Sequence, residues 1–169
     1  MLRPFRDRLP LVDETAYIDE TAQVIGDVEV GAESSIWMNV VVRGDVNFIR
    51  IGRRTNIQDG TVVHVQRLTH PTRIGDQVTV GHAAVVHGCT IGNRVLVGMG
   101  AIVMNGAEIG EDSIVGAGAL VTERTVVPAR SLVLGRPAKV HRALTDAEVA
   151  SILQYSENYV QYRLEYMKR

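Results

Sequence analysis

Cysteine, aromatic residues and long apolar runs are all scarce in this chain of 169 residues. The single cysteine, Cys89, excludes an intrachain disulfide and gives no sign of an oxidising compartment. No run approaches the ~20 apolar residues that span a membrane, and the first residues lack the apolar core of a signal peptide. The net charge is −1 and the Lys and Arg residues are scattered, so no basic surface for nucleic acid is indicated. We therefore expect a cytoplasmic protein with neither nucleic acid nor a membrane as partner.

What the chain does contain is an aliphatic residue at nearly every sixth position. These residues are Ile18, Val24, Val30, Ile36, Val42, Ile51, Ile57, Val63, Ile74, Val80, Val86, Ile91, Val97, Val103, Ile109, Val115 and Val121. A period of six fits neither an amphipathic helix nor strands in a meander. It predicts one inward aliphatic per short strand and turn, three such units per coil, and parallel pairing between coils. A sandwich rich in Ile, Val and Gly would not need such regular spacing.

The repeat ends after Val121, and residues 135–139 (Gly-Arg-Pro-Ala-Lys) mark an exit from the coil. Residues 145–167 then predict a helix, with Thr145 as N-cap and Glu148 completing a capping box. We expect this helix to pack along the outside of the coil. The predicted organisation is an all-β parallel β-helix domain over residues 1–140 and a C-terminal α-helix segment over residues 141–169, packed on it.

Two interruptions of the six-residue period help to locate candidate functional residues. The interval before Ile51 is three residues too long, which predicts a short loop near residues 45–48. The interval before Ile74 is longer still and predicts a loop near residues 66–72. If neither loop changes the phase, the three faces of the coil can be counted through the whole chain.

This count aligns three polar side chains in one outward column, because a residue next to an inward residue points outward. They are Arg43, His64 and His87. The two histidines would lie roughly one strand spacing apart, about 5 Å, which lets both imidazoles bind one ion through Zn–N bonds of about 2.0–2.1 Å. His82 falls on another face and is not expected to reach the same ion within one chain. In a threefold assembly it could complete a three-histidine site from the neighbouring subunit.

The same count places further polar residues beside these histidines. Gln58 and Asp59 fall near His82, whereas Arg43 and Asp45 share the face of the other two. A salt bridge between Arg43 and Asp59 across the subunit interface is then expected, because the guanidinium fork matches a carboxylate.

The segments that carry these residues closely resemble the γ-class carbonic anhydrases and their homologues. The matching segments are 42–45 (Val-Arg-Gly-Asp), 56–59 (Asn-Ile-Gln-Asp), 62–65 (Val-Val-His-Val) and 80–88 (Val-Gly-His-Ala-Ala-Val-Val-His-Gly). The repeat itself resembles the hexapeptide-repeat, left-handed β-helix proteins. The left-handed sense comes from this resemblance, since the general crossover rule favours the right-handed one.

The resemblance implies a homotrimer with metal sites between subunits. His64 and His87 from one subunit and His82 from its neighbour would be the metal ligands. Gln58 would hydrogen-bond the water on the metal, while Arg43, Asp45 and Asp59 would support the site and the interface.

Three neutral imidazoles leave a divalent cation its full charge and an open position, so a bound water can ionise near neutral pH and attack CO₂. The resemblance thus implies reversible hydration of CO₂ to bicarbonate. Zn²⁺ suits tetrahedral imidazole ligation, and Fe²⁺ or Co²⁺ accept the same ligands.

Two acidic positions of the best-characterised type of this class are missing. Val46 stands where that type has a glutamate, and residues 66–72 contain no carboxylate to carry protons. His70 could replace the missing shuttle, because its ordinary pKa near 6.5 suits proton transfer, or it could be a solvated loop residue. Two alternatives therefore stay open: a catalytically weak metal-binding homologue, and a hexapeptide acyl-CoA-dependent acyltransferase.

Overall fold

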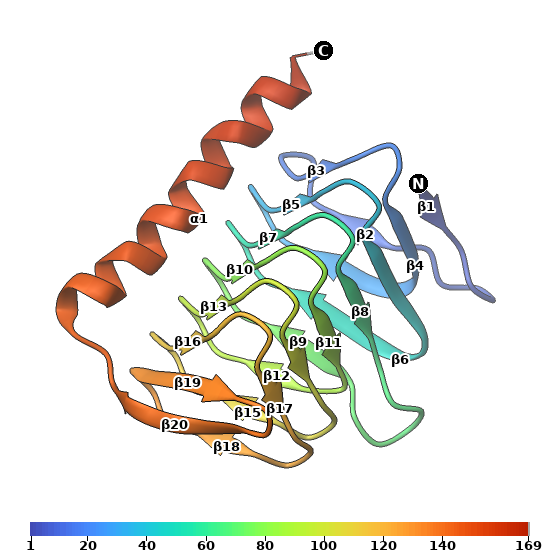
Figure 1. The fold of residues 1–169 in the computed structure, drawn as a ribbon. Coiled ribbons are helices and arrows are strands. Elements are labelled where there is room, and N and C mark those ends of the chain that lie inside the picture. Colours follow the sequence, from blue (N-terminus) through green and yellow to red (C-terminus); the bar gives the residue numbers. More distant parts are fainter. Residues whose placement is uncertain (169) are drawn as a thin grey trace.

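The computed structural model describes residues 1–168 and shows a left-handed parallel β-helix of about seven turns with one helix along its outside (Figure 1). The predicted fold class is confirmed. The strands are β1 (Leu2–Arg3), β2 (Leu11–Val12), β3 (Tyr17–Ile18), β4 (Gln23–Val30), β5 (Ser35–Ile36), β6 (Val41–Ile51), β7 (Asn56–Ile57), β8 (Val62–His64), β9 (Thr72–Ile74), β10 (Thr79–Val80), β11 (Val85–His87), β12 (Thr90–Ile91), β13 (Leu96–Val97), β14 (Ile102–Val103), β15 (Glu108–Ile109), β16 (Ile114–Val115), β17 (Leu120–Val121), β18 (Val126–Val127), β19 (Ser131–Gly135) and β20 (Ala138–Ala143), and the helix is α1 (Asp146–Met167).

The aliphatic residues of the repeat stack in register from coil to coil. Val63 pairs with Val42 on one side and with Val86 on the other, and Val80 pairs with Ile57. All five side chains are buried without exposed surface, so they form part of one continuous aliphatic core. The phase count across the two interruptions of the repeat is therefore correct.

The two interruptions differ in structure. Residues 66–71 form the predicted longer loop, which is closed where the Gln66 amide donates to the His70 carbonyl at 2.9 Å. The short loop predicted near residues 45–48 is wrong, because β6 continues through it as a strand. Its pairing with β4 shifts register between Gly26 and Val28, so that residues 45–48 stand opposite a single residue. The extra residues are absorbed as an irregularity of the sheet rather than as an excursion from the coil.

The predicted helix is confirmed, with the predicted cap. The Thr145 hydroxyl accepts from the Glu148 amide and the Glu148 carboxylate accepts from the Thr145 amide, which forms a capping box. Trp37 anchors the other half of the helix, because its ring lies 5.3 Å from that of Tyr159 and 5.1 Å from that of Tyr166. The helix thereby stays alongside the face formed by β5, β7, β10, β13 and β16 (Figure 1).

The coil closes with β20, which pairs antiparallel with β19 and covers that end of the sheet. The division of the chain at residue 140 stays a prediction, and β20 runs across it. Among the described residues, no helix has the length and apolar character needed to cross a membrane.

Candidate metal centre

His64 and His87 come together at the ends of two neighbouring strands. β8 and β11 pair in register so that these two residues are direct partners, and their ring centroids lie 5.0 Å apart. Nδ1 of His64 lies 3.0 Å from Nε2 of His87. Both side chains are half-buried. The predicted stacking of His64 and His87 on successive coils is therefore confirmed.

Each of these rings has a hydrogen-bond partner on its other nitrogen. His64 Nε2 lies 3.0 Å from Asp45 Oδ1, and His87 Nδ1 lies 2.7 Å from Asn105 Oδ1. A carboxylate only accepts hydrogen bonds, so the proton of neutral His64 belongs on Nε2. The amide oxygen of Asn105 also accepts, so the proton of neutral His87 belongs on Nδ1.

This arrangement leaves two lone pairs facing each other, on His64 Nδ1 and His87 Nε2. Two acceptor nitrogens at 3.0 Å repel one another unless a proton or a cation lies between or beside them. Neutral imidazoles oriented by a carboxylate or amide are a typical donor set for Zn²⁺ and related ions. The two residues thus fit a divalent cation.

The surroundings of His64, above all its burial, favour the neutral form of this ring. Burial is the largest influence and lowers the pKa of His64, while the hydrogen bond to Asp45 opposes that effect. Burial raises the pKa of Asp45, but hydrogen bonds from His64 and Arg43 outweigh it and hold that pKa below its usual range. Arg43 forms its salt bridge with Asp45 of the same chain. The predicted bridge from Arg43 to Asp59 across an interface stays a prediction.

His82 lies on the adjacent face, just past β10, and is separate from the other two histidines. Its Nδ1 lies 3.0 Å from Asp59 Oδ2, which leaves Nε2 without the proton in the neutral ring. Gln58 Nε2 donates to Asn56 Oδ1 at 3.0 Å. Within residues 1–168 of a single chain, no three His, Cys, Asp or Glu side chains are close enough together to hold a metal.

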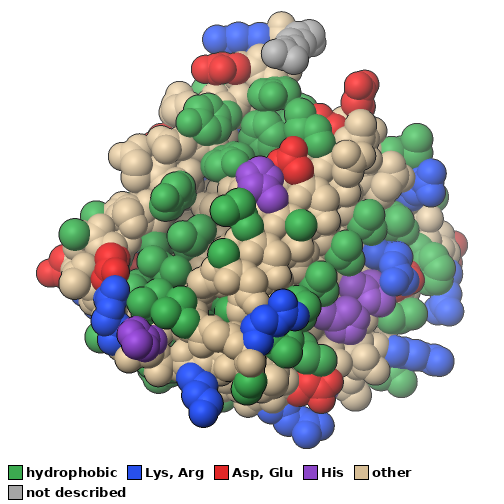
Figure 2. All heavy atoms as spheres, in the orientation of Figure 1, with side chains coloured by type: hydrophobic (Ala, Val, Ile, Leu, Met, Phe, Trp, Pro, Cys, Tyr) green, Lys and Arg blue, Asp and Glu red, His purple; other side chains and the backbone are tan. Residues whose placement is uncertain are grey.

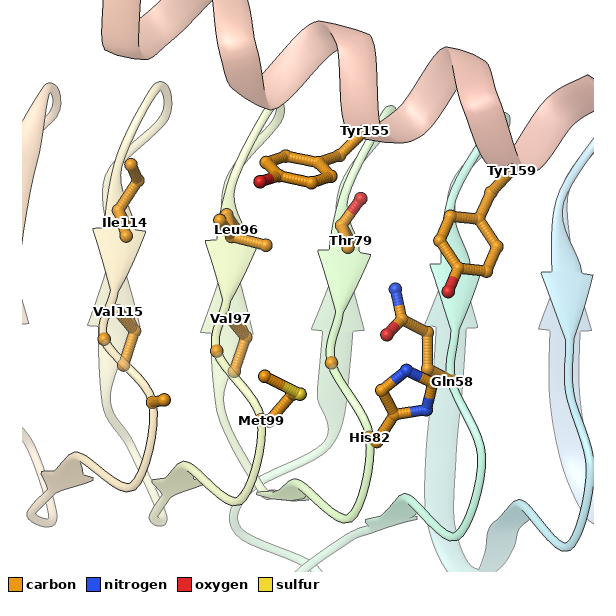
Figure 3. A pocket seen from close by; sticks show the side chains of 14 residues that line it. Gln58, Thr79, His82, Leu96, Val97, Met99, Ile114, Val115, Tyr155 and Tyr159 are labelled. Atoms are coloured by element: carbon orange, nitrogen blue, oxygen red, sulfur yellow. The ribbon is translucent and has the colours of Figure 1, made fainter.

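An apolar groove of about 410 Å³ runs from His82 between α1 and the strands β10, β13 and β16. Figure 3 shows Gln58, His82 and Tyr159 gathered at one end of it, with Leu96, Met99 and Ile114 further along. On the face drawn in Figure 2, apolar side chains gather beside the helix. Burial, and to a lesser extent the negative charge of Asp59, raise the pKa of Tyr159, so its hydroxyl stays neutral.

The sequence analysis missed Asn105, and it left the place of His70 open. Asn105 follows β14 on the next coil and also donates from Nδ2 to Glu123 Oε1 at 3.2 Å. The His70 ring packs on the coil, since a Cβ at Gly106 would lie 3.1 Å from its Nε2. His70 is therefore held against the β-helix rather than extended into solvent, and its role as a proton shuttle stays a prediction.

Comparison with known proteins places these features in a family. The family model of the bacterial transferase hexapeptide (six repeats) matches residues 88–123. Gamma carbonic anhydrase 1, mitochondrial, of Arabidopsis thaliana is 46% identical over 158 residues, which are 90% of this chain and 58% of the relative. The carbonic anhydrase of Geobacillus kaustophilus is 41% identical over 161 residues, 95% of this chain and 88% of the relative.

The chain belongs to the γ-class carbonic anhydrase-like family. It spans 58% of the length of the Arabidopsis relative. Among solved structures, a putative acetyltransferase of Bacillus cereus has a TM-score of 0.96 and 41% sequence identity, with 98% of this chain and 96% of that chain covered. Proteins similar to this chain thus carry names from two classes of enzyme.

Proposed function

We propose that this chain forms a homotrimer that hydrates CO₂ reversibly to bicarbonate at a divalent cation held between subunits. The observation that carries the proposal is the 3.0 Å approach of His64 Nδ1 to His87 Nε2, each with a partner on its other nitrogen. A purely structural pair of histidines would gain nothing from this arrangement, because it opposes two lone pairs. A cation is stabilised by it.

The third ligand in this proposal is His82 of the neighbouring subunit. His82 is oriented by Asp59 in the same way as His64 is by Asp45, so all three imidazoles keep one nitrogen free. His82 also lies at one end of the apolar groove, and Met99, which lines the same groove, is 58% exposed. A second copy of the chain that covers this groove would bury its apolar surface and bring the two halves of the site together.

Zn²⁺ is the proposed ion, with Fe²⁺ and Co²⁺ as alternatives that accept the same ligands. When bound, such a cation is a Lewis acid that lowers the pKa of a coordinated water to about 7. Gln58 has its amide nitrogen committed to Asn56, so its oxygen is left to accept a hydrogen bond from the water or from bicarbonate. Asp45 and Asp59 keep their histidines in the ligating tautomers, and Arg43 neutralises Asp45.

Transfer of a proton from the metal-bound water to solvent is the step for which this site offers the fewest groups. Val46 is 38% exposed and cannot carry a proton, and Asp45 and Asp59 are both engaged by histidines. Proton transfer would then depend on His70 or on buffer molecules from solvent. We therefore expect slow turnover that rises with the concentration of an imidazole buffer.

Three measurements on the purified protein test the proposal together: the oligomer mass, the metal content and the rate of CO₂ hydration after loading with zinc or ferrous iron. We expect a trimer, about one metal per subunit by its threefold symmetry, and activity that is lost in His64→Ala. His141→Ala is the matched control, because His141 lies exposed on β20, outside the site. A monomer, or a protein that takes up no metal, would refute it.

Acyl transfer is the second candidate function, and the name of the Bacillus cereus structure favours it. That reaction would use one histidine as a general base and needs no cation. Turnover of acetyl-CoA that persists after complete removal of metal would support it over CO₂ hydration. The cytoplasmic location stays a prediction.

A further inference from the structure

We propose that Asn105 and Glu123 are a positioning pair that holds His87 in the one tautomer able to bind a cation. This inference rests on the proposed metal site and adds two residues of the next coils to it. Neither residue would touch the cation or the substrate. Their role would be to decide which nitrogen of His87 carries the proton.

An asparagine amide can face a histidine in two ways. With its oxygen toward Nδ1, Asn105 accepts the proton of that nitrogen and leaves Nε2 free. With its NH₂ toward Nδ1, it would donate, and the proton of His87 would have to move to Nε2. The second arrangement would block the very atom that lies 3.0 Å from His64.

Glu123 removes this ambiguity. Its Oε1 lies 3.2 Å from Asn105 Nδ2, and a carboxylate can only accept. A flipped amide would set the Asn105 oxygen against the carboxylate of Glu123, with two acceptors in contact. The orientation that satisfies Glu123 is therefore the one that presents an oxygen to His87, at 2.7 Å.

The backbone also makes room for this contact. Gly88 has a positive φ of 58°, and a Cβ at this position would lie 2.5 Å from Asn105 Oδ1. A side chain at residue 88 would displace the amide from His87. The glycine next to the histidine thus permits the approach of Asn105 from the following coil.

The matching carboxylates on the other two histidines support the same role. Asp45 contacts His64 and Asp59 contacts His82, each at 3.0 Å and each on the nitrogen that is not left free. Among residues 1–168, no carboxylate contacts the ring of His87 directly. Instead, Glu123 accepts from the NH₂ of Asn105, and this turns the amide oxygen of Asn105 toward His87 as the acceptor.

The test measures two properties of the full-length protein: the tautomer of His87 without metal, by ¹⁵N NMR at a pH of about 8.5 where imidazole is neutral, and zinc affinity, by competition with a chromophoric chelator. The wild-type ring should carry its proton on Nδ1. Asn105→Leu should lose this preference and bind zinc 10–100-fold more weakly, as is typical for partners of metal ligands. Glu123→Gln should mix the tautomers and weaken binding roughly fivefold, the worth of one hydrogen bond.

The double variant N105D/E123Q is the decisive control. Its carboxylate at position 105 would accept from His87, its amide at position 123 would donate back, and the net charge is unchanged. We expect it to restore both the tautomer and the affinity, which a purely structural role would not. Asn93→Leu removes another corner asparagine, whose oxygen accepts from the Asp76 amide, and should change neither.

The results separate the two proposals. If wild-type protein binds no zinc, the proposed function fails, while the tautomer of His87 still tests the positioning pair. If wild-type protein binds zinc but Asn105→Leu keeps both its tautomer and its affinity, the positioning pair is refuted and the proposed function stands. A double variant no better than Glu123→Gln alone would also refute it.

Discussion

A site shared between subunits can be rebuilt from two defective chains, and this gives the sharpest test of the interface. His64 and His87 lie on one face of the coil, and His82 lies on the adjacent one. Neither His64→Ala nor His82→Ala alone should then hold a cation, because every site in either homotrimer lacks one ligand. Mixed trimers differ, since a site can take its first two histidines from one variant and its third from the other.

The size of the recovery follows from the geometry. In a threefold assembly each site joins the first face of one subunit to the second face of the next. With equal amounts of the two variants and random assembly, about one quarter of the sites receive both intact faces. Co-refolded mixtures should therefore regain about a quarter of the wild-type zinc content and of any CO₂ hydration, measured by metal analysis and stopped-flow assay.

A mixture of His64→Ala with His87→Ala is the matched control. Both changes affect the same face, so no combination of these chains yields an intact site and no recovery is expected. Equal recovery in both mixtures, or none in either while wild-type protein binds zinc, would show that the site is not shared in the proposed way.

Three further predictions concern assembly and stability. Met99→Asp places a charge beside the apolar groove and should convert the proposed trimer into monomers, as measured by light scattering. Gly98→Ala adds a Cβ that would lie 2.5 Å from a backbone nitrogen of the next coil, and should cost about 1–3 kcal/mol in urea unfolding, whereas Gly100→Asn, at an open corner with positive φ, should cost less. The hydrogen bond from Arg94 is the main cause that holds the pKa of Asp112 below its usual range, so the unfolded chain binds more protons near pH 4. Stability from this pair should be present above that pH and lost as the pH falls, and Asp112→Asn should weaken the acid dependence of unfolding; an unchanged dependence would contradict this.

The sequence predicts the fold well because one period governs it. The aliphatic residues every six positions require an inward column, and the 66–71 loop leaves and re-enters the coil without changing that column. The interruption at residues 45–48 is different. The spacing of the aliphatic residues shows how many residues are inserted, but it does not predict whether these residues leave the sheet or stay in the strand. Phe48, for example, stays on the sheet with the guanidinium carbons of Arg50 and Arg73 at 4.6 and 4.7 Å from its ring centroid.

Counting the repeat does not identify Asn105 as the neighbour of His87, because the coil that connects them is one residue shorter than 18. Val86 pairs with Val103, 17 positions later, so the residue that corresponds to His87 on the next coil is Met104. Asn105 reaches His87 only because Gly88 offers no side chain in its path. A periodic pattern fixes which strands are neighbours, whereas the contact that orients a ligand depends on one corner glycine and on the direction of a single amide. The positions of the candidate ligands are therefore predictable from spacing, and the residues proposed to set their tautomers become visible only when side chains are placed.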